Sequence, residues 1–237
     1  MDAVALFDID GTLLRRAGPH HRQALEEAVW RVAGVRASTQ QIPVQGMLDC
    51  DILRQMLQSA GVPERQITVL LPHVIELAQQ IYDCPRLEAR LCPGLPHSLR
   101  QLQEAGVRLG LVSGNLPRIG WRKIEQAGLR AFFTFGAFAG MGATRAELVH
   151  IARQIALQSG ASTQVPFALI GDHTNDILAA RLNRVRSIAV ATGVLSAQEL
   201  AQAEPDILLD DLTQLSLDML APAAGRATAG PERLAGG

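Results

Sequence analysis

Short apolar runs of strand length alternate with helical patterns along most of this chain, and this alternation constrains its fold more than any other feature. The first apolar run begins at Val4, and the last covers Ile207 to Leu209. Between them, strands are expected at 107–112, 132–137, 165–170 and 187–191, and helices at 97–105, 121–127, 146–158 and 176–182. Strands that alternate with helices predict an α/β fold built on a doubly wound parallel sheet.

The segment between Leu14 and Cys92 has a different character, because it shows no strand pattern. Apolar residues recur at helical spacing in 20–32, 49–59 and 64–82. A chain of 237 residues has room for one large or two small domains. We therefore expect an α/β core over 1–14 and 93–220, an inserted all-helical cap domain over 15–92, and a disordered Ala/Gly/Pro-rich tail over 221–237.

Composition excludes several classes of protein. A formal net charge of -1 gives no electrostatic case for binding nucleic acid or an anionic membrane. Three cysteines with no C-x-x-C pattern favour a reducing cytoplasm over a disulfide framework, and the histidines show no zinc-site spacing. The chain begins Met-Asp without a basic segment, so no secretory signal is expected. A cytoplasmic protein with a small-molecule partner fits best, and the oligomeric state stays open.

Polar side chains end three of the apolar runs. Asp8 and Asp10 follow the first run, and since residues i and i+2 of a strand point the same way, both carboxylates should face one site. Another run ends in Ser113, and a third is followed by Asp172. Binding sites of open α/β sheets form at the carboxyl ends of strands, near the point where the strand order reverses. The three clusters are therefore expected to meet, although an acidic turn is the alternative for Asp8 and Asp10.

Three segments resemble the motifs of the haloacid dehalogenase superfamily of aspartate-nucleophile hydrolases. Residues 8–12 (Asp-Ile-Asp-Gly-Thr) resemble its first motif, residues 112–115 the second and residues 171–176 the fourth. The helical insertion is similar to the cap of the phosphoglycolate phosphatase and β-phosphoglucomutase branch. The resemblance covers roughly residues 1–218 and implies a Rossmann-like core that performs phosphoryl transfer.

The resemblance also implies residue roles. Asp8 would attack phosphorus and form an aspartyl-phosphate. The side chain of Asp10 would protonate the leaving oxygen and then activate water. The hydroxyl of Ser113 would bind phosphoryl oxygens. Further substrate-binding residues would be Thr12, Gly114 and Asn115.

A magnesium site follows from the same resemblance. Mg²⁺ would be held by Asp8, by the backbone carbonyl of Asp10 and by Asp172, and it would offset the repulsion between nucleophile and substrate. Asp176 would orient this metal shell from outside. The alternative is structural, with Asp172 as a helix N-cap and Asp176 as an acid of the first turn. His173, beside them, is expected to be a loop residue that points away.

The third motif departs from the family pattern, which has a lysine that steadies the nucleophile and the phosphoryl group. The best-placed basic residue is Arg145, at the head of the helix expected after residue 145. Arginine keeps the charge and can bind phosphate with two nitrogens, although it is bulkier than lysine. Lys123, the one lysine of the chain, is the second candidate, and a solvated Arg145 is the structural alternative.

These observations predict a Mg²⁺-dependent phosphatase that acts on a small phosphorylated metabolite. A phosphosugar mutase with the same machinery and a non-catalytic binding member of the fold are the alternatives. Gly46 to Asp49, with Ile52 and Arg54, is the expected substrate-facing edge of the cap. The sequence does not name the substrate.

Overall fold

The computed structural model describes residues 2–15, 19–82 and 91–221. Its centre is one parallel sheet of six strands in the order β3-β2-β1-β4-β5-β6. This sheet confirms the predicted doubly wound α/β fold, and the strand order reverses between β1 and β4, the position where such sheets form binding sites. The strands are β1 (Ala3–Phe7), β2 (Val107–Ser113), β3 (Phe135–Phe138), β4 (Phe167–Gly171), β5 (Arg186–Val190) and β6 (Ile207–Leu209).

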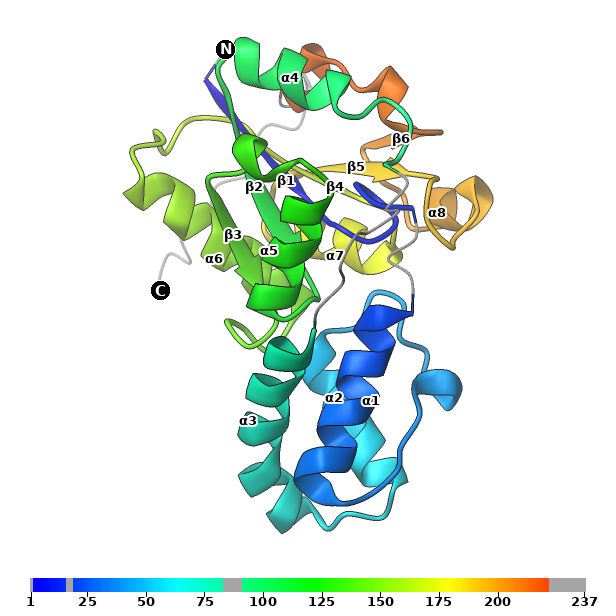
Figure 1. The fold of residues 1–237 in the computed structure, drawn as a ribbon. Coiled ribbons are helices and arrows are strands. Elements are labelled where there is room, and N and C mark those ends of the chain that lie inside the picture. Colours follow the sequence, from blue (N-terminus) through cyan, green and yellow to red (C-terminus); the bar gives the residue numbers. More distant parts are fainter. Residues whose placement is uncertain (1, 16–18, 83–90, 222–237) are drawn as a thin grey trace, which may run out of the picture.

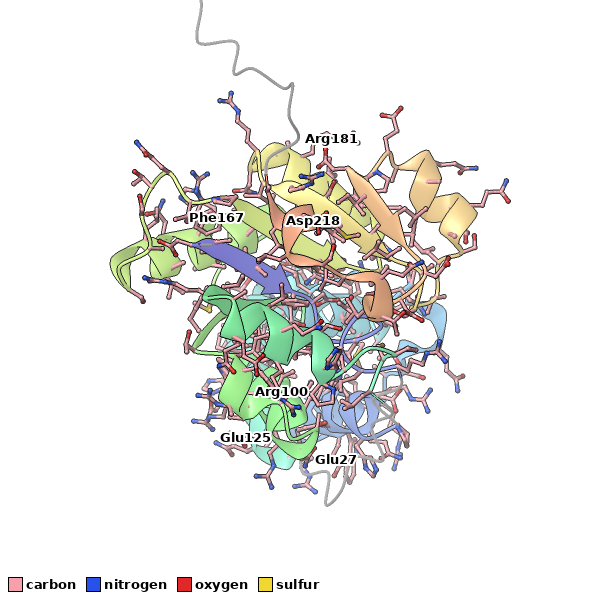
Figure 2. All side chains as sticks on the ribbon, turned by 90° about the horizontal axis from the view of Figure 1, so that it is seen from above. Glu27, Arg100, Glu125, Phe167, Arg181 and Asp218 are labelled. Atoms are coloured by element: carbon pink, nitrogen blue, oxygen red, sulfur yellow. The ribbon has the colours of Figure 1, made fainter. Side chains whose placement is uncertain are left out.

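Helices cover both faces of the sheet, and the central strand shows why. Along β1, Val4 and Leu6 belong to one hydrophobic core while Phe7 belongs to the other, because alternate side chains point to opposite faces. Figure 2 shows β1 between the two helical layers, with Arg100 labelled on one side and Arg181 on the other. The first core receives α6 (Arg145–Gln158) and α7 (Thr174–Leu182), and the second receives α4 (His97–Glu104) and part of α5 (Pro117–Gln126).

Three helices lie between β1 and α4 in the chain and pack on one another: α1 (His20–Ala33), α2 (Asp49–Ser59) and α3 (Glu64–Ile81). Figure 1 shows them as a group at one end of the molecule, below the sheet. The segments that enter and leave this group meet where Leu14 bridges Leu91 and the Cys92 amide donates to the Leu13 carbonyl at 3.0 Å. None of the helices in 2–15, 19–82 and 91–221 is long and apolar enough to cross a membrane.

The predicted cap limits of 15–92 fall beside residues outside the described ranges, and the predicted tail over 221–237 lies outside them except for Ala221. The domain limits therefore stay a prediction. The predicted helices at 20–32, 49–59 and 64–82 are confirmed to within one residue at each end.

Two predicted starts lie three or four residues from the observed ones, and one helix was not predicted. The helix expected from residue 121 begins at Pro117, because proline is tolerated in the first turn, where its missing N–H has no partner in any case. The strand expected from residue 132 begins at Phe135, after a short 3-10 helix. The helix α8 (Ala197–Gln202) was not predicted, because six residues are too few for periodicity to show. The 3-10 helices are Thr39–Gln41, Arg130–Phe132, Leu212–Gln214 and Leu217–Leu220.

Candidate active site

The polar ends of three neighbouring strands meet beside one cavity. Asp8 follows β1, Ser113 ends β2, and Asp172 follows β4, while the parallel register aligns Phe7 with Leu111 and with Ile170. The cavity has a volume of about 1180 Å³. Its lining includes Asp8, Asp10, Ser113, Asn115, Arg145 and Asp172, together with residues of the inserted helical segment.

The turn that follows β1 depends on the backbone conformation of a glycine. Gly11 has φ of +89°, a left-handed conformation that other residues adopt at a cost, and its amide donates to the Leu14 carbonyl at 2.8 Å. Thr12 is fully buried, and its hydroxyl donates to Asp172 at 3.0 Å. Thr12, which was predicted to bind substrate, therefore has its side chain committed to the acidic residue of the neighbouring strand.

Three buried carboxylates form a compact cluster. Asp8, Asp172 and Asp176 each offer an oxygen within 4.8 Å of the others. Burial raises the pKa of Asp172 well above its usual range, and the nearby charges of Asp8 and Asp176 raise it further. Burial also raises the pKa of Asp176, with Arg145 acting in the opposite direction. Both shifts reflect an excess of negative charge in a buried site.

Arg145 supplies the positive charge closest to the cluster. It is the first residue of α6, and its side chain is 8% exposed. One guanidinium nitrogen donates to Asp8 Oδ1 at 3.1 Å and to the Val112 carbonyl at 3.1 Å, and Nε lies 3.3 Å from Asp176 Oδ1. Arg145 therefore contacts Asp8, the predicted nucleophile. The structural alternative, in which its side chain is solvated, does not hold.

The donor set fits a hard divalent cation. Three carboxylates facing one guanidinium leave two negative charges in a buried site, and carboxylate oxygens are the ligands that Mg²⁺ and Ca²⁺ prefer. Asp176 Oδ1 is buried and lacks a hydrogen-bond partner among the described residues. Gly11 and Gly193 enclose the Asp172 carboxylate so closely that a Cβ on either would overlap it. These residues could hold a metal ion.

Asp10 lies beside this cluster but has separate partners. Its Oδ2 accepts hydrogen bonds from Lys123 Nζ at 2.6 Å and from Asn115 Nδ2 at 2.7 Å. Burial by itself would raise the pKa of Asp10, but the charge of Lys123, together with the nearby His21 and the two hydrogen bonds, holds it below its ordinary value. The other oxygen, Oδ1, has no hydrogen-bond partner within the part of the chain that the structure describes.

The segment after β2 packs against the inserted helical segment. Asn115 Nδ2 also donates to the Ser113 hydroxyl at 2.7 Å. Gly114 lies against the Met47 carbonyl, where a Cβ would overlap it, and the Gly114 carbonyl accepts from the Asp49 amide at 2.8 Å. Gly114 therefore allows close approach of the two segments, and Asn115 orients both Asp10 and Ser113.

Only part of the predicted substrate-facing edge lines the cavity. Gly46, Met47, Asp49 and Ile52 line the cavity, whereas Arg54 pairs with Glu64 on the exposed surface of the helical group.

The prediction for His173 is wrong. His173 lines the cavity, its Nδ1 accepts from the Asn175 amide at 3.2 Å at the start of α7, and its ring packs under Gly46. Burial and the charge of Arg145 lower its pKa.

His21 of the inserted helices reaches the site without having been predicted there, and it contacts Asp49 of the predicted substrate-facing edge. His21 on α1 lies 3.2 Å from Lys123 Nζ through its Nδ1, and its Nε2 lies 2.9 Å from Asp49 Oδ2. Asp49 is 2% exposed and also accepts from the Leu116 amide at 2.7 Å. A histidine on an amphipathic helix has no sequence signal that separates it from an ordinary surface residue.

Comparison with known families and proteins gives matches over most of the chain. A sequence model of the family described as haloacid dehalogenase-like hydrolase matches residues 3–182. The phosphoglycolate phosphatase of Vibrio cholerae serotype O1 is 27% identical over 212 residues, which cover 88% of this chain and 93% of that protein. The phosphoglycolate phosphatase of Agrobacterium fabrum is 28% identical over 222 residues, which cover 91% of both chains.

Solved structures with the same fold include two bacterial proteins. A variant of CbbY from Rhodobacter sphaeroides, in complex with xylulose-(1,5)bisphosphate, has a TM-score of 0.70 at 21% identity and covers 94% of this chain and 100% of that one. The β-phosphoglucomutase from Clostridium difficile has a TM-score of 0.67 at 17% identity, with 92% and 95% covered. At these identities the likeness is one of fold.

Proposed function

Because this chain belongs to the haloacid dehalogenase-like hydrolases, we propose that it removes phosphate from a small phosphorylated metabolite, with Asp8 as the nucleophile. The observation that carries the proposal is the convergence of Asp8, Asp10, Ser113, Arg145 and Asp172 on one cavity at the carboxyl ends of β1, β2 and β4. Phosphoryl transfer depends mainly on positioning and on neutralising charge, and this arrangement supplies both.

Asp8 is prepared for attack by its buried neighbours. Arg145 donates to Oδ1, so the carboxylate is fixed in one orientation, and Oδ2 is the atom that we assign to the attack on phosphorus. The product of this step is an aspartyl-phosphate on Asp8. Arg145 keeps its positive charge beside the anionic nucleophile and the incoming phosphoryl group. In this role it takes the position that lysine holds in most of the family.

Asp10 is the proposed proton-transfer group. Lys123 and Asn115 hold its Oδ2, which fixes the carboxyl group beside the cavity, where it would give a proton to the leaving group and later take one from water. The lowered pKa of Asp10 does not oppose this role, because a bound phosphoryl anion disfavours the charged carboxylate and raises its pKa.

Mg²⁺ is the proposed cofactor, held by the side chains of Asp8 and Asp172 and by the Asp10 carbonyl, with Asp176 beside them. When bound, it would neutralise negative charge shared by the nucleophile and the phosphoryl group. Thr12 and the two glycines around Asp172 fix that carboxylate for this task. The Ser113 hydroxyl, oriented by Asn115, is assigned to a phosphoryl oxygen.

We assign the helical group to a cap over residues 15–92 and the sheet to a core over 1–14 and 93–220. A cavity of about 1180 Å³ is far larger than a phosphate group, so most of it is available to the rest of the substrate. The part contributed by the cap is lined by apolar side chains such as Leu25, Ile42 and Ile52 and by polar ones such as Arg22 and Gln45, which are the proposed determinants of specificity.

Release of phosphate from a panel of phosphorylated metabolites tests the proposal, with phosphoglycolate and sugar phosphates included. We expect release that requires Mg²⁺, stops with a chelator, and is lost in Asp8→Asn but kept in the control Asp51→Asn, which changes an exposed aspartate of α2. Release by Asp8→Asn would refute the nucleophile assignment. A mutase would instead move the phosphoryl group within its substrate with little net release.

A further inference from the structure

Lys123, which holds Asp10 in the proposed reaction, also has contacts beyond that carboxylate. It is the one lysine of the chain, it lies on α5, and its side chain is fully buried. Its ammonium nitrogen lies 2.6 Å from Asp10 Oδ2, 2.7 Å from Asn115 Oδ1 and 3.2 Å from His21 Nδ1. An ammonium has three N–H donors, and these three acceptors satisfy all of them, which is the condition for burying such a charge.

The third acceptor comes from the cap, whereas the first two come from the core. When Lys123 donates to His21 Nδ1, the ring must carry its proton on Nε2, and that nitrogen lies 2.9 Å from Asp49 Oδ2. The same carboxylate oxygen accepts from the Leu116 amide at the start of α5. A continuous set of contacts thus leads from Asp10 through Lys123 into the cap and back to the helix that carries Lys123.

A second group of cap–core contacts on α5 has no link to Asp10. Arg118 pairs with Glu76 of α3 at 3.0 Å, and its amide donates to Gln79 at 3.1 Å. The Arg118 side chain is 62% exposed, in contrast with Lys123. This pair joins the same two parts of the protein and therefore provides a control for contacts that only hold the cap in place.

We propose that Lys123 is a positioning residue that fixes Asp10 for proton transfer, and that it does so fully only when the cap residue His21 supplies its third hydrogen bond. This inference rests on the proposed function, in which Asp10 exchanges the proton. In the absence of His21, one N–H of a buried ammonium has no acceptor, so Lys123 shifts and Asp10 loses its fixed orientation.

Measuring the two steps of the reaction separately distinguishes this positioning role from a general loss of structure. Nitrophenolate leaves p-nitrophenyl phosphate without a proton, so the first step needs Asp8 but not Asp10, whereas hydrolysis of the aspartyl-phosphate needs Asp10 to take a proton from water. In rapid mixing with Mg²⁺, we expect Lys123→Met to release a first equivalent of nitrophenolate at the wild-type rate. Its steady-state rate should then fall by about 100-fold.

The cap side of the contact is tested by two adjacent histidines of α1. His21→Leu should repeat the pattern of Lys123→Met, with the first turnover kept and the later turnovers slowed. His20→Leu, which changes a residue that lines a different pocket on the cap, should behave as wild type, and so should Arg118→Gln. The double variant Lys123→Met/His21→Leu should be no slower than Lys123→Met alone, because both residues act in one set of contacts.

Equal slowing of both steps in Lys123→Met, or no slowing of either, would overturn the inference. If Lys123→Met fails to fold, His21→Leu decides, and a wild-type steady-state rate in that variant would overturn it as well. Failure of the proposed function would look different. In that case wild-type protein would release no nitrophenolate with Mg²⁺, or Asp8→Asn would still release it.

Discussion

At the level of single residues, the acidic cluster depends on Arg145 for its balance of charge. The guanidinium contacts Asp8 and Asp176 in a site where all three side chains are at most 8% exposed. Removing one partner of a buried ion pair is costly because it leaves the other charge without compensation. Arg145 therefore has a structural task in addition to its proposed part in phosphoryl transfer.

Arg145→Ala should lower the free energy of unfolding by about 3–5 kcal/mol when a chelator keeps the site free of metal. Arg145→Lys should lose less, because it keeps the charge but cannot reproduce the planar set of contacts. Chemical denaturation of the three proteins measures both values. Equal stability of wild type and Arg145→Ala would contradict the role of this ion pair.

Asp172 gives the metal-free protein a predicted dependence on pH. Its pKa is higher in the folded state than in the unfolded chain, so its contribution to stability is complete below about pH 4 and is lost as the pH rises through its folded value. Asp172→Asn removes this dependence. The melting temperature of the variant, relative to wild type, should therefore increase between about pH 5 and about pH 8. A constant difference over that range would contradict the raised pKa.

The two described thiols should be unreactive in the native protein. The pKa of both Cys50 and Cys92 is raised to about 11, mainly by burial, and at Cys50 the nearby aspartates contribute to the same rise. Since the thiolate is the reactive form, alkylation near about pH 8 should be slow until the chain unfolds. Cys84→Ser removes the third thiol, and mass spectrometry of this variant follows the other two. Fast alkylation of the folded protein would show that these thiols ionise more easily.

Single residues were predictable where a motif identified them. Asp8, Asp10, Ser113 and Asp172 could be found because each follows a predicted strand, and strand ends meet in a parallel sheet. His21 could not, since its place beside the cavity depends on how the cap packs against the core, and the contact of Asp49 with the Leu116 amide has the same cause. Thr12 lay within a recognised motif, but only the structure shows that its hydroxyl is directed to Asp172.

At the level of elements, two glycines of the inserted segment differ in what surrounds them. Gly34 ends α1 and Gly46 precedes α2, and both have φ of +69°. A Cβ at Gly34 would have nothing within 4 Å, whereas a Cβ at Gly46 would overlap the His173 ring of the core. Asn175 Nδ2 also donates to the Gly46 carbonyl at 2.9 Å. The segment around Gly46 is therefore a docking point between cap and core.

The pair Gly34→Ala and Gly46→Ala tests this docking point. Both variants carry the same backbone strain, which should cost about 1 kcal/mol. Only Gly46→Ala must also displace His173, so it should lower kcat/KM, while Gly34→Ala leaves kcat/KM unchanged. Steady-state kinetics with thermal melting measures both effects. Equal kcat/KM in the two variants would show that the Gly46 contact does not matter for turnover.

Regular elements were predictable because their apolar residues recur at 2.0 or 3.6 residues. The helix α2 was predicted at its observed limits, and its buried residues Ile52, Leu53, Met56 and Leu57 give the reason. The early start of α5 was missed, because it rests on Pro117 and on the contact between Leu116 and Asp49 of the cap. A periodic pattern contains no information about such a contact.

At the level of the whole molecule, the active site belongs to both parts of the chain. The core supplies the carboxylates at the strand ends, and the cap supplies His21, Asp49 and the far wall of the cavity. The three contacts of Lys123 join these parts at the residue proposed to move the proton. Closure of the cap would thus exclude water and, in the same movement, supply the third hydrogen bond of Lys123, the residue that holds Asp10.

In the proposed reaction, Asp8 carries the phosphoryl group between two chemical steps. The most direct test is mass spectrometry of acid-quenched Asp10→Asn after mixing with p-nitrophenyl phosphate and Mg²⁺. Because this variant lacks the group that takes a proton from water, we expect one phosphoryl group to accumulate and peptide mapping to place it on Asp8. A variant that stays unmodified while it turns over, or a phosphoryl group on any other residue, would contradict the account.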